Sequence, residues 1–207
     1  RKEVLDLKKA RASAIRAALS IDDHLSDFSN FRCYRRNGLH MYLKSGTGAK
    51  LTSRTKASIK SLLKRNMEGP YGSEWPYEER IKHREMVSVE ARYIFVYEFS
   101  EEKPKEVLES EGLKKTSTRD ETIAAFVHYR FVFEEEVPVV YVYELQLEQR
   151  VQGKGLGQFL MQLIELIAQK NGMGAVMLTV QRTNLLAMRF YIDKLQYQVS
   201  SISPSRF

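Results

Sequence analysis

This chain of 207 residues has a single cysteine, Cys33, so no disulfide can form within it. A lone thiol is typical of proteins from reducing compartments. No apolar run approaches the length of a membrane span, and no signal-peptide pattern is visible. The four histidines show no ligand spacing with Cys33, so the sequence predicts no metal site. The length is that of one domain with a sizeable core.

The net charge of +7 is unevenly distributed along the chain. Residues 1–66 carry 16 Lys and Arg against 5 Asp and Glu, whereas residues 67–207 carry 17 against 21. Two interpretations of the basic first third stay open: a surface that contacts nucleic acid or an acidic partner, and a solvated helix face. The acidic remainder favours a cationic substrate and argues against nucleic acid as the direct substrate.

The most informative motif is a glycine-rich turn between a predicted strand (residues 139–147, β-branched and aromatic) and a predicted apolar helix (residues 159–168). The turn consists of Gln152, Gly153, Lys154, Gly155, Leu156 and Gly157. Such a turn directs backbone N–H groups and a helix dipole at one point, which favours a pyrophosphate. The glycine spacing excludes the dinucleotide fingerprint, and Gly155 after Lys154 excludes the nucleoside-triphosphate loop. A plain glycine turn is the alternative.

A second motif lies near the C-terminus. A predicted strand over residues 175–180 is followed by Asn184, Ala187, Phe190 and Tyr191. This spacing, with Gln-x-x-Gly-x-Gly in the turn, resembles the GNAT superfamily of N-acetyltransferases, although Gln196 stands where that family usually has glycine. The resemblance implies acetyl-CoA as co-substrate. The cofactor-binding residues that it implies are Leu145, Gln146, Leu147, Gln152, Gly153, Lys154, Gly155, Leu156, Gly157, Gln158, Asn184 and Tyr191.

The predicted order of elements favours an α+β protein with the acyl-CoA N-acyltransferase fold, in which helices flank a mixed, mostly antiparallel central sheet. Helices are expected over residues 2–20, 53–67 and 76–86, with a Ser53 cap and a break at residues 69–72. Further strands are expected over residues 39–43, 92–99, 122–133, 138–147 and 195–200, with a charged connection over residues 100–119. We divide the chain into an N-terminal helical segment that packs on the core (residues 1–24) and an acetyltransferase domain (residues 25–207).

A closer resemblance, from about residue 25 onward, is to the histone-specific N-terminal acetyltransferases of this superfamily. It is carried by segments at residues 66–75, 128–131, 141–157, 177–180 and 203–205. It implies acetylation of the α-amine of histone tails that begin Ser-Gly-Arg-Gly. It also implies a monomer without an auxiliary subunit, located in the nucleus and cytoplasm, with neither a membrane nor nucleic acid as direct partner.

Glu144 is the candidate catalytic residue that stands out. It interrupts an apolar strand, where a carboxylate is costly unless it is paired or functional. By resemblance, Glu144 binds the first substrate residues and helps to remove the amine proton, with Tyr143 and Tyr71 completing the pocket and Thr179 bonding the substrate backbone. The alternative for Glu144 is a structural ion pair with Arg130.

Tyr191 matches the family's tyrosine that often protonates the departing thiolate, and its alternative is a half-buried aromatic on an amphipathic helix. We expect direct transfer in a ternary complex, with a backbone N–H near Leu145 stabilising the oxyanion. One departure from the closer relatives is Val132, where they carry an aspartate; the acidic run at residues 134–136 is a candidate replacement. A lysine or polyamine acetyltransferase of the same fold and a silent acyl-CoA-binding module stay open as alternatives.

Overall fold

The computed structural model describes residues 2–99 and 122–203. The predicted charged connection at residues 100–119 and most of the Ser-Pro-Ser tail therefore lie outside the described residues. No helix in the described ranges is long and apolar enough to cross a membrane.

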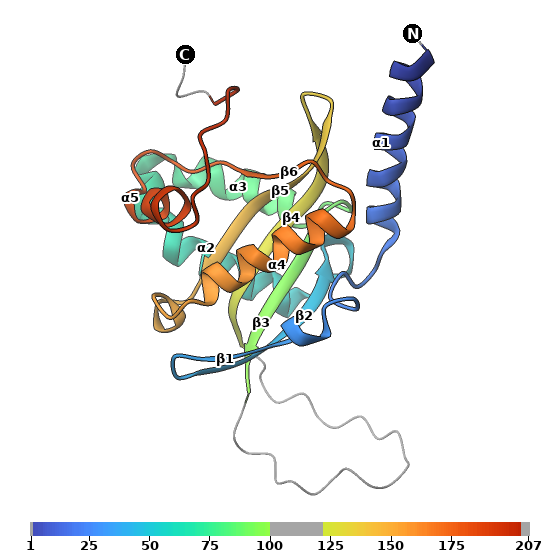
Figure 1. Cartoon of the computed structure of the whole chain (residues 1–207). Helices are drawn as coiled ribbons and strands as arrows, with labels where there is room; N and C mark the ends of the chain where they lie inside the picture. The colour runs from blue at the N-terminus through green and yellow to red at the C-terminus, as the bar shows by residue number, and fades with distance from the viewer. Residues whose placement is uncertain (1, 100–121, 204–207) are drawn as a thin grey trace, which may run out of the picture.

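The centre of the molecule is a six-stranded sheet whose spatial order follows the chain order (Figure 1). Its strands are β1 (Cys33–Arg36), β2 (Leu39–Thr47), β3 (Arg92–Glu98), β4 (Ile123–Glu134), β5 (Val137–Leu147) and β6 (Ala175–Leu178). All neighbours pair antiparallel except β5 and β6, which pair parallel. The predicted fold class, α+β with a mixed and mostly antiparallel sheet, is confirmed.

Helices cover both faces of this sheet. The helices are α1 (Lys2–Ser20), α2 (Ser53–Tyr71), α3 (Trp75–Met86), α4 (Leu156–Lys170) and the short α5 (Leu185–Met188). One hydrophobic cluster joins α1 and α4 to one face, and a second cluster joins α2 and α3 to the other. Each face of β3 and β4 is thus covered, which explains their nearly continuous apolar sequence.

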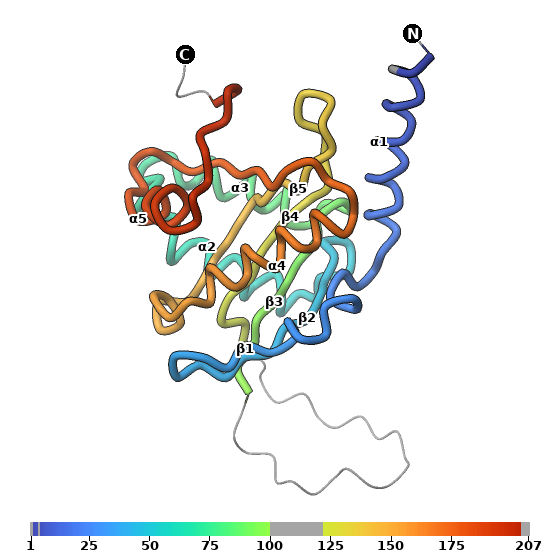
Figure 2. The backbone as a smooth tube through the Cα atoms, viewed as in Figure 1, coloured from blue at the N-terminus to red at the C-terminus, as the bar shows by residue number. Residues whose placement is uncertain are grey.

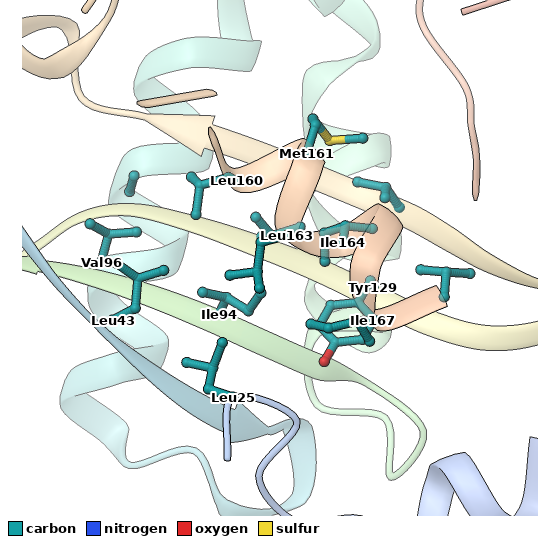
Figure 3. Close-up of a cluster of buried hydrophobic side chains, with 14 of the residues drawn as sticks. Leu25, Leu43, Ile94, Val96, Tyr129, Leu160, Met161, Leu163, Ile164 and Ile167 are labelled. Atoms are coloured by element: carbon teal, nitrogen blue, oxygen red, sulfur yellow. The ribbon is translucent and has the colours of Figure 1, made fainter. Parts of the chain in front are cut away.

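The apolar stripe of α4 forms the centre of the first cluster. Its buried side chains include Leu160, Met161, Leu163, Ile164 and Ile167, which face the sheet in Figure 3. Burial of each such side chain contributes about 1.5–3 kcal/mol. This packing holds the beginning of α4, and with it the preceding glycine-rich turn, at the edge of the sheet.

The helix α1 packs on the core through its C-terminal half only. Ile15 and Ala18 are buried, whereas Leu5 and Leu7 are exposed. Lys8 and Arg11 hold the side chain and the backbone carbonyl of Glu136 at the β4–β5 turn. Figure 2 shows this turn projecting between α1 and the C-terminal segment.

Two sequence-based expectations about α2 are wrong. Thr52, not Ser53, is the N-cap, because the Thr52 side chain accepts a hydrogen bond from Thr55 N. The helix also continues through Pro70 to Tyr71, and it ends where Gly72 takes a positive φ of 54° and donates its N–H to Glu68 O. Tyr71 therefore belongs to the last turn of α2 and is not an exposed residue of a loop.

The predicted strand over residues 195–200 is also wrong, because the described residues after β6 contain no further strand. The chain turns at Gln196, whose φ is 60°, and Tyr197 folds back to donate its N–H to Tyr191 O (2.9 Å) and its hydroxyl to Glu165. The helix predicted before it is the four-residue α5, continued by a π-helical turn, Arg189–Lys194.

Candidate active site

The candidate site lies where the pairing of β5 with β6 stops. The last paired residues are Val142 and Leu178, so residues 143–147 of β5 have no strand partner on that side within the described ranges. Glu148 N donates to Ala124 O of β4 (2.8 Å). Because alternate residues of an antiparallel strand face the same neighbour, the backbone groups of Leu145 and Leu147 face away from β4, toward this open edge.

The predicted phosphate loop is held by the β1–β2 hairpin. Lys154 O accepts hydrogen bonds from the Tyr34 hydroxyl (2.6 Å) and from Asn37 Nδ2 (2.9 Å). Gly155 has a φ of 85° at the N-cap of α4, and a Cβ there would lie 2.8 Å from the Tyr34 hydroxyl. Only glycine fits this position without strain. The loop thus has the backbone conformation, the small residues and the helix start that a pyrophosphate requires.

Two side chains occupy part of the open edge. Leu147 O accepts from Gln152 Nε2 (2.9 Å) and from Asn66 Nδ2 (3.0 Å). Of the backbone groups predicted to pair with the pantetheine arm, the Leu147 carbonyl is therefore already bonded. The Leu147 N–H and the backbone groups of Leu145 are directed toward the edge. Leu156 is buried in the core, and only its backbone belongs to the loop.

Glu144 lies just beyond the end of the β5–β6 pairing and is buried. Its Oε1 accepts from Lys82 Nζ (2.5 Å) and its Oε2 from Gln146 Nε2 (2.8 Å). Gln146 Oε1 in turn accepts from Asn66 Nδ2 (2.9 Å). Glu144 does form an ion pair, but its partner is Lys82 of α3 and not the expected Arg130. The side chain of Gln146, which is among the residues predicted to bind the cofactor, orients this carboxylate.

Tyr143, next to Glu144 on β5, belongs to a group of stacked rings. Tyr143 is an extra residue on β5, at a register shift opposite the His128–Tyr129 step of β4, and such a bulge re-aims side chains near many sites. Its ring stacks on His128 (5.0 Å between centroids), and the Arg130 guanidinium lies 4.3 Å from its centroid. Burial raises the pKa of Tyr143 and of Tyr71 above their ordinary values.

Of the predicted residues from the C-terminal part, Tyr191 and Thr179 lie near the open edge of β5. Burial, reinforced by the charge of Glu144, raises the pKa of Tyr191 above the usual phenol range, so this hydroxyl keeps its proton at neutral pH. Thr179 follows β6, and its hydroxyl hydrogen-bonds the Tyr141 hydroxyl (2.5 Å). Asn184 caps α5 by accepting from Ala187 N (3.2 Å).

The acidic run considered as a replacement for the missing aspartate does not lie beside Glu144. Glu134 pairs with Val137 at the β4–β5 turn, toward the other end of β5. Glu136 is held there by α1. Val132 pairs with Val139 across the β4–β5 hairpin. Neither residue of this pair supplies a carboxylate in place of the missing aspartate.

The comparisons with known proteins identify the family. The model of the Acetyltransferase (GNAT) family matches residues 57–196, which include most of α2, the strands β3 to β6 and the loop before α4. The chain belongs to the GNAT acetyltransferase family. Enzymes of this family use acetyl-CoA, and the loop, the helix start and the open β5 edge described above fit that co-substrate.

Solved GNAT-type structures match most of this chain. A ribosomal-protein-alanine N-acetyltransferase from Brucella melitensis biovar Abortus 2308 aligns with a TM-score of 0.50 at 12% identity, covering 79% of this chain and 95% of its own. A possible acetyltransferase from Clostridium difficile 630 aligns with a TM-score of 0.54 at 11% identity (79% and 94%). An aminoglycoside acetyltransferase from an uncultured soil metagenomic sample aligns with a TM-score of 0.51 at 13% identity (79% and 93%). At these identities the likeness shows the GNAT fold alone.

Lys82 and Asn66 are two residues of the site that the sequence did not predict. Trp75, Lys82 and Met86 share the spacing of one helix face, and Trp75 and Met86 are buried. A lysine on the apolar stripe of a helix that begins at Trp75 is a detectable signal, because such a residue needs a buried anionic partner. Asn66 carries no comparable signal, since its role depends on the distant residues Gln146 and Leu147.

The β1–β2 hairpin leads to a prediction about the GNAT cofactor loop. Tyr34→Phe and Asn37→Gly each remove one donor to Lys154 O, and glycine tolerates the φ of 53° at position 37. Loss of one such bond costs about 1 kcal/mol. We therefore expect each variant to raise the KM for acetyl-CoA several-fold while kcat changes little, as measured by steady-state kinetics. An unchanged KM in the double variant would show that the hairpin does not hold the loop for binding.

Proposed function

We propose that this GNAT protein is an N-terminal acetyltransferase that acetylates the α-amine of histone tails beginning Ser-Gly-Arg-Gly. The segments at residues 66–75, 128–131 and 141–157 support this proposal, because they are most like those of N-alpha-acetyltransferase D. The proposal includes that enzyme's properties: action as a monomer without an auxiliary subunit, histone tails as partners, and a location in the nucleus and cytoplasm.

The observation that carries the proposal is the buried Glu144 carboxylate beside the open edge of β5. An N-terminal amine has an ordinary pKa of about 7.7–8.0, so a useful fraction is neutral at physiological pH. A lysine amine, near 10.4 by the same reference scale, needs a stronger base. The Glu144 carboxylate has one donor on each oxygen, so it is an oriented hydrogen-bond acceptor for an N-terminal amine.

The residues of the site then have separate tasks. The loop from Gln152 to Gly157 binds the pyrophosphate, and the free backbone groups of Leu145 bind the pantetheine arm as an added strand. Acetyl-CoA supplies the activated acetyl group as a thioester. Glu144 accepts a hydrogen bond from the incoming amine and helps to remove its proton, directly or through a water molecule. The Tyr191 hydroxyl, which keeps its proton, is positioned in this proposal to protonate the thiolate.

Substrate recognition in the proposal relies on aromatic rings and on charge. Tyr71 and Tyr143 flank the carboxylate from α2 and β5, and Thr179 offers a hydroxyl from the end of β6. The negative balance of residues 67–207 suits a tail that carries Arg and Lys. This balance supports a peptide substrate over a nucleic-acid substrate.

The test is acetyl transfer from acetyl-CoA to a Ser-Gly-Arg-Gly-Lys peptide, with the acetylated atom located by tandem mass spectrometry. A matched peptide with a blocked N-terminus serves as the control. We expect acetyl on the serine α-amine and none on the blocked peptide. Acetyl on lysine in both peptides would contradict the proposal in favour of a lysine acetyltransferase. Binding of acetyl-CoA without any transfer would favour the silent acyl-CoA-binding module.

A further inference from the structure

Lys82 lies on the buried side of α3. Its side chain is 12% exposed, and it lies one helical turn before the buried Met86. It reaches across to β5, where its ammonium meets the Glu144 carboxylate, whose side chain is 7% exposed. A charged lysine is almost never buried to this degree unless it is paired, so this contact is the reason that the helix tolerates it.

The two oxygens of Glu144 accept hydrogen bonds from two different donors. Lys82 Nζ holds Oε1 at 2.5 Å, and Gln146 Nε2 holds Oε2 at 2.8 Å. The amide fixes the plane of the carboxylate, whereas only the ammonium carries charge. An ionised carboxylate has about four lone-pair sites on its two oxygens, so each oxygen can still accept from a third group. The amine of a substrate can therefore bind a carboxylate that is already oriented.

Among the described residues, no other cation forms an ion pair with Glu144. Arg130, the other cation near the site, donates Nη2 to Glu85 O (2.7 Å) and lies over the Tyr143 ring. Burial alone would lower the pKa of Lys82, but the charge and hydrogen bond of Glu144 raise it above its ordinary value. Lys82 consequently stays charged at neutral pH. Its ammonium also lies 5.4 Å from the centroid of the Tyr71 ring, beside the proposed substrate pocket.

We propose that Lys82 is a positioning residue of the amine site, which holds the Glu144 carboxylate in the orientation that accepts the substrate amine. Without the ammonium, the Glu144 carboxylate loses one of its two donors and turns toward another one, so it no longer faces the amine proton. Lys82 itself neither gives nor takes a proton in the reaction. The inference rests on the proposed acetyl transfer to an amine and adds a residue from α3 to that site.

The experiment is a double-mutant cycle on kcat with four proteins: wild type, Lys82→Met, Glu144→Gln and the double variant. Methionine keeps the aliphatic stem and removes the charge. Lys82→Arg is the rescue variant, because it restores a cation at the same position. Lys50→Met is the matched control, since Lys50 pairs with Asp22 on the surface, with side chains 70% and 81% exposed. Substrates are the Ser-Gly-Arg-Gly-Lys peptide, its N-terminally blocked form and spermidine.

If Lys82 acts through Glu144, the two losses do not add. We expect Lys82→Met to lower kcat about 10- to 100-fold, as for residues in direct contact, with little change in the KM for acetyl-CoA. In the Glu144→Gln background the same substitution should change kcat less than about two-fold. Lys82→Arg should recover part of the loss, and Lys50→Met should behave as wild type. The double variant contains neither buried charge, so its folding does not depend on the pair.

The outcomes separate the inference from the proposed function. Additive losses in the cycle, or no recovery by Lys82→Arg while a thermal melt shows a folded protein, would overturn the role of Lys82. Transfer to the blocked peptide or to spermidine, but not to the free N-terminus, would overturn the N-terminal function and leave the cycle readable with that amine. Absence of transfer to all three substrates would overturn both.

Discussion

Replacing Glu144 with glutamine is expected to lower kcat for acetyl transfer by about 10²- to 10⁴-fold, the usual contribution of a positioned general base. Glutamine keeps the size of the side chain and can still accept from Gln146 or Lys82, but it cannot take a proton. It also leaves the Lys82 ammonium buried without an anionic partner. Because the cofactor loop is separate from this carboxylate, the KM for acetyl-CoA should change little.

The measurement is steady-state kinetics with the Ser-Gly-Arg-Gly-Lys peptide, accompanied by thermal unfolding to confirm that the variant folds. Asp22→Asn is the matched control, because Asp22 also pairs with a lysine, Lys50, but on the surface. A surface pair contributes about 0–1 kcal/mol, so this control should keep full activity and stability. A folded Glu144→Gln protein with kcat within a few-fold of wild type would exclude Glu144 as the base.

The cofactor loop could be predicted from the sequence because its defining features lie within a few consecutive residues. Gly155 shows why such a motif is specific: its positive φ and the nearby Tyr34 hydroxyl leave no room for a Cβ. Glu144 could be singled out for a related reason, since a carboxylate within an apolar strand is locally anomalous. The partner of Glu144 is distant in the sequence. The sequence suggests Arg130 on the neighbouring strand, but the cation is Lys82 of α3, the helix that covers this face of the sheet.

The misplaced elements have a common cause, which is a contact with a distant part of the chain. A helix break is expected at residues 69–72 because Gly-Pro-Tyr-Gly usually ends a helix, yet the α2 helix continues to Tyr71, which packs against the second hydrophobic cluster with Tyr93 and Phe126. The residues after Leu195 were expected to pair as a strand. They instead follow the contacts of Tyr197 with Tyr191 and Glu165, which no local pattern reveals. Tertiary packing overrides local preference in both places.

Acidification from pH 7 to pH 5 is expected to destabilise the fold strongly, because two histidines are buried in the neutral form. Burial and the neighbouring Arg92 lower the pKa of His24 to about 4, and burial with Arg130 and Lys82 lowers the pKa of His128 to about 3. Both values lie below the ordinary value of 6.5, so the unfolded chain binds protons that the folded chain does not. Stability should therefore fall as the pH drops below about 6.5.

Each of these two histidines should lower the free energy of unfolding by about 2 kcal/mol between pH 7 and pH 5. Together they amount to a large part of the 5–15 kcal/mol that is usual for a domain, on the same order-of-magnitude scale. Asp23, whose pKa is lowered despite its burial by its bonds to Ser45 and Arg32, loses its contribution only below about 3.8, outside this window. Glu85, whose pKa burial raises, acts in the opposite direction and reduces the effect.

The check is urea unfolding of wild type, His24→Gln and His128→Phe at pH 7 and at pH 5, comparing each protein's own loss between the two pH values. A uniform cost of the substitution cancels in this comparison. Phenylalanine at position 128 keeps the stacking on Tyr93 and Tyr143, and His128 Nε2 has no hydrogen-bond partner in the described part of the chain. The loss should shrink by about 2 kcal/mol in each variant. It should not shrink in His83→Gln, since His83 is exposed on α3. An equal loss in all four proteins would mean that carboxylates, not the buried imidazoles, control the acid response.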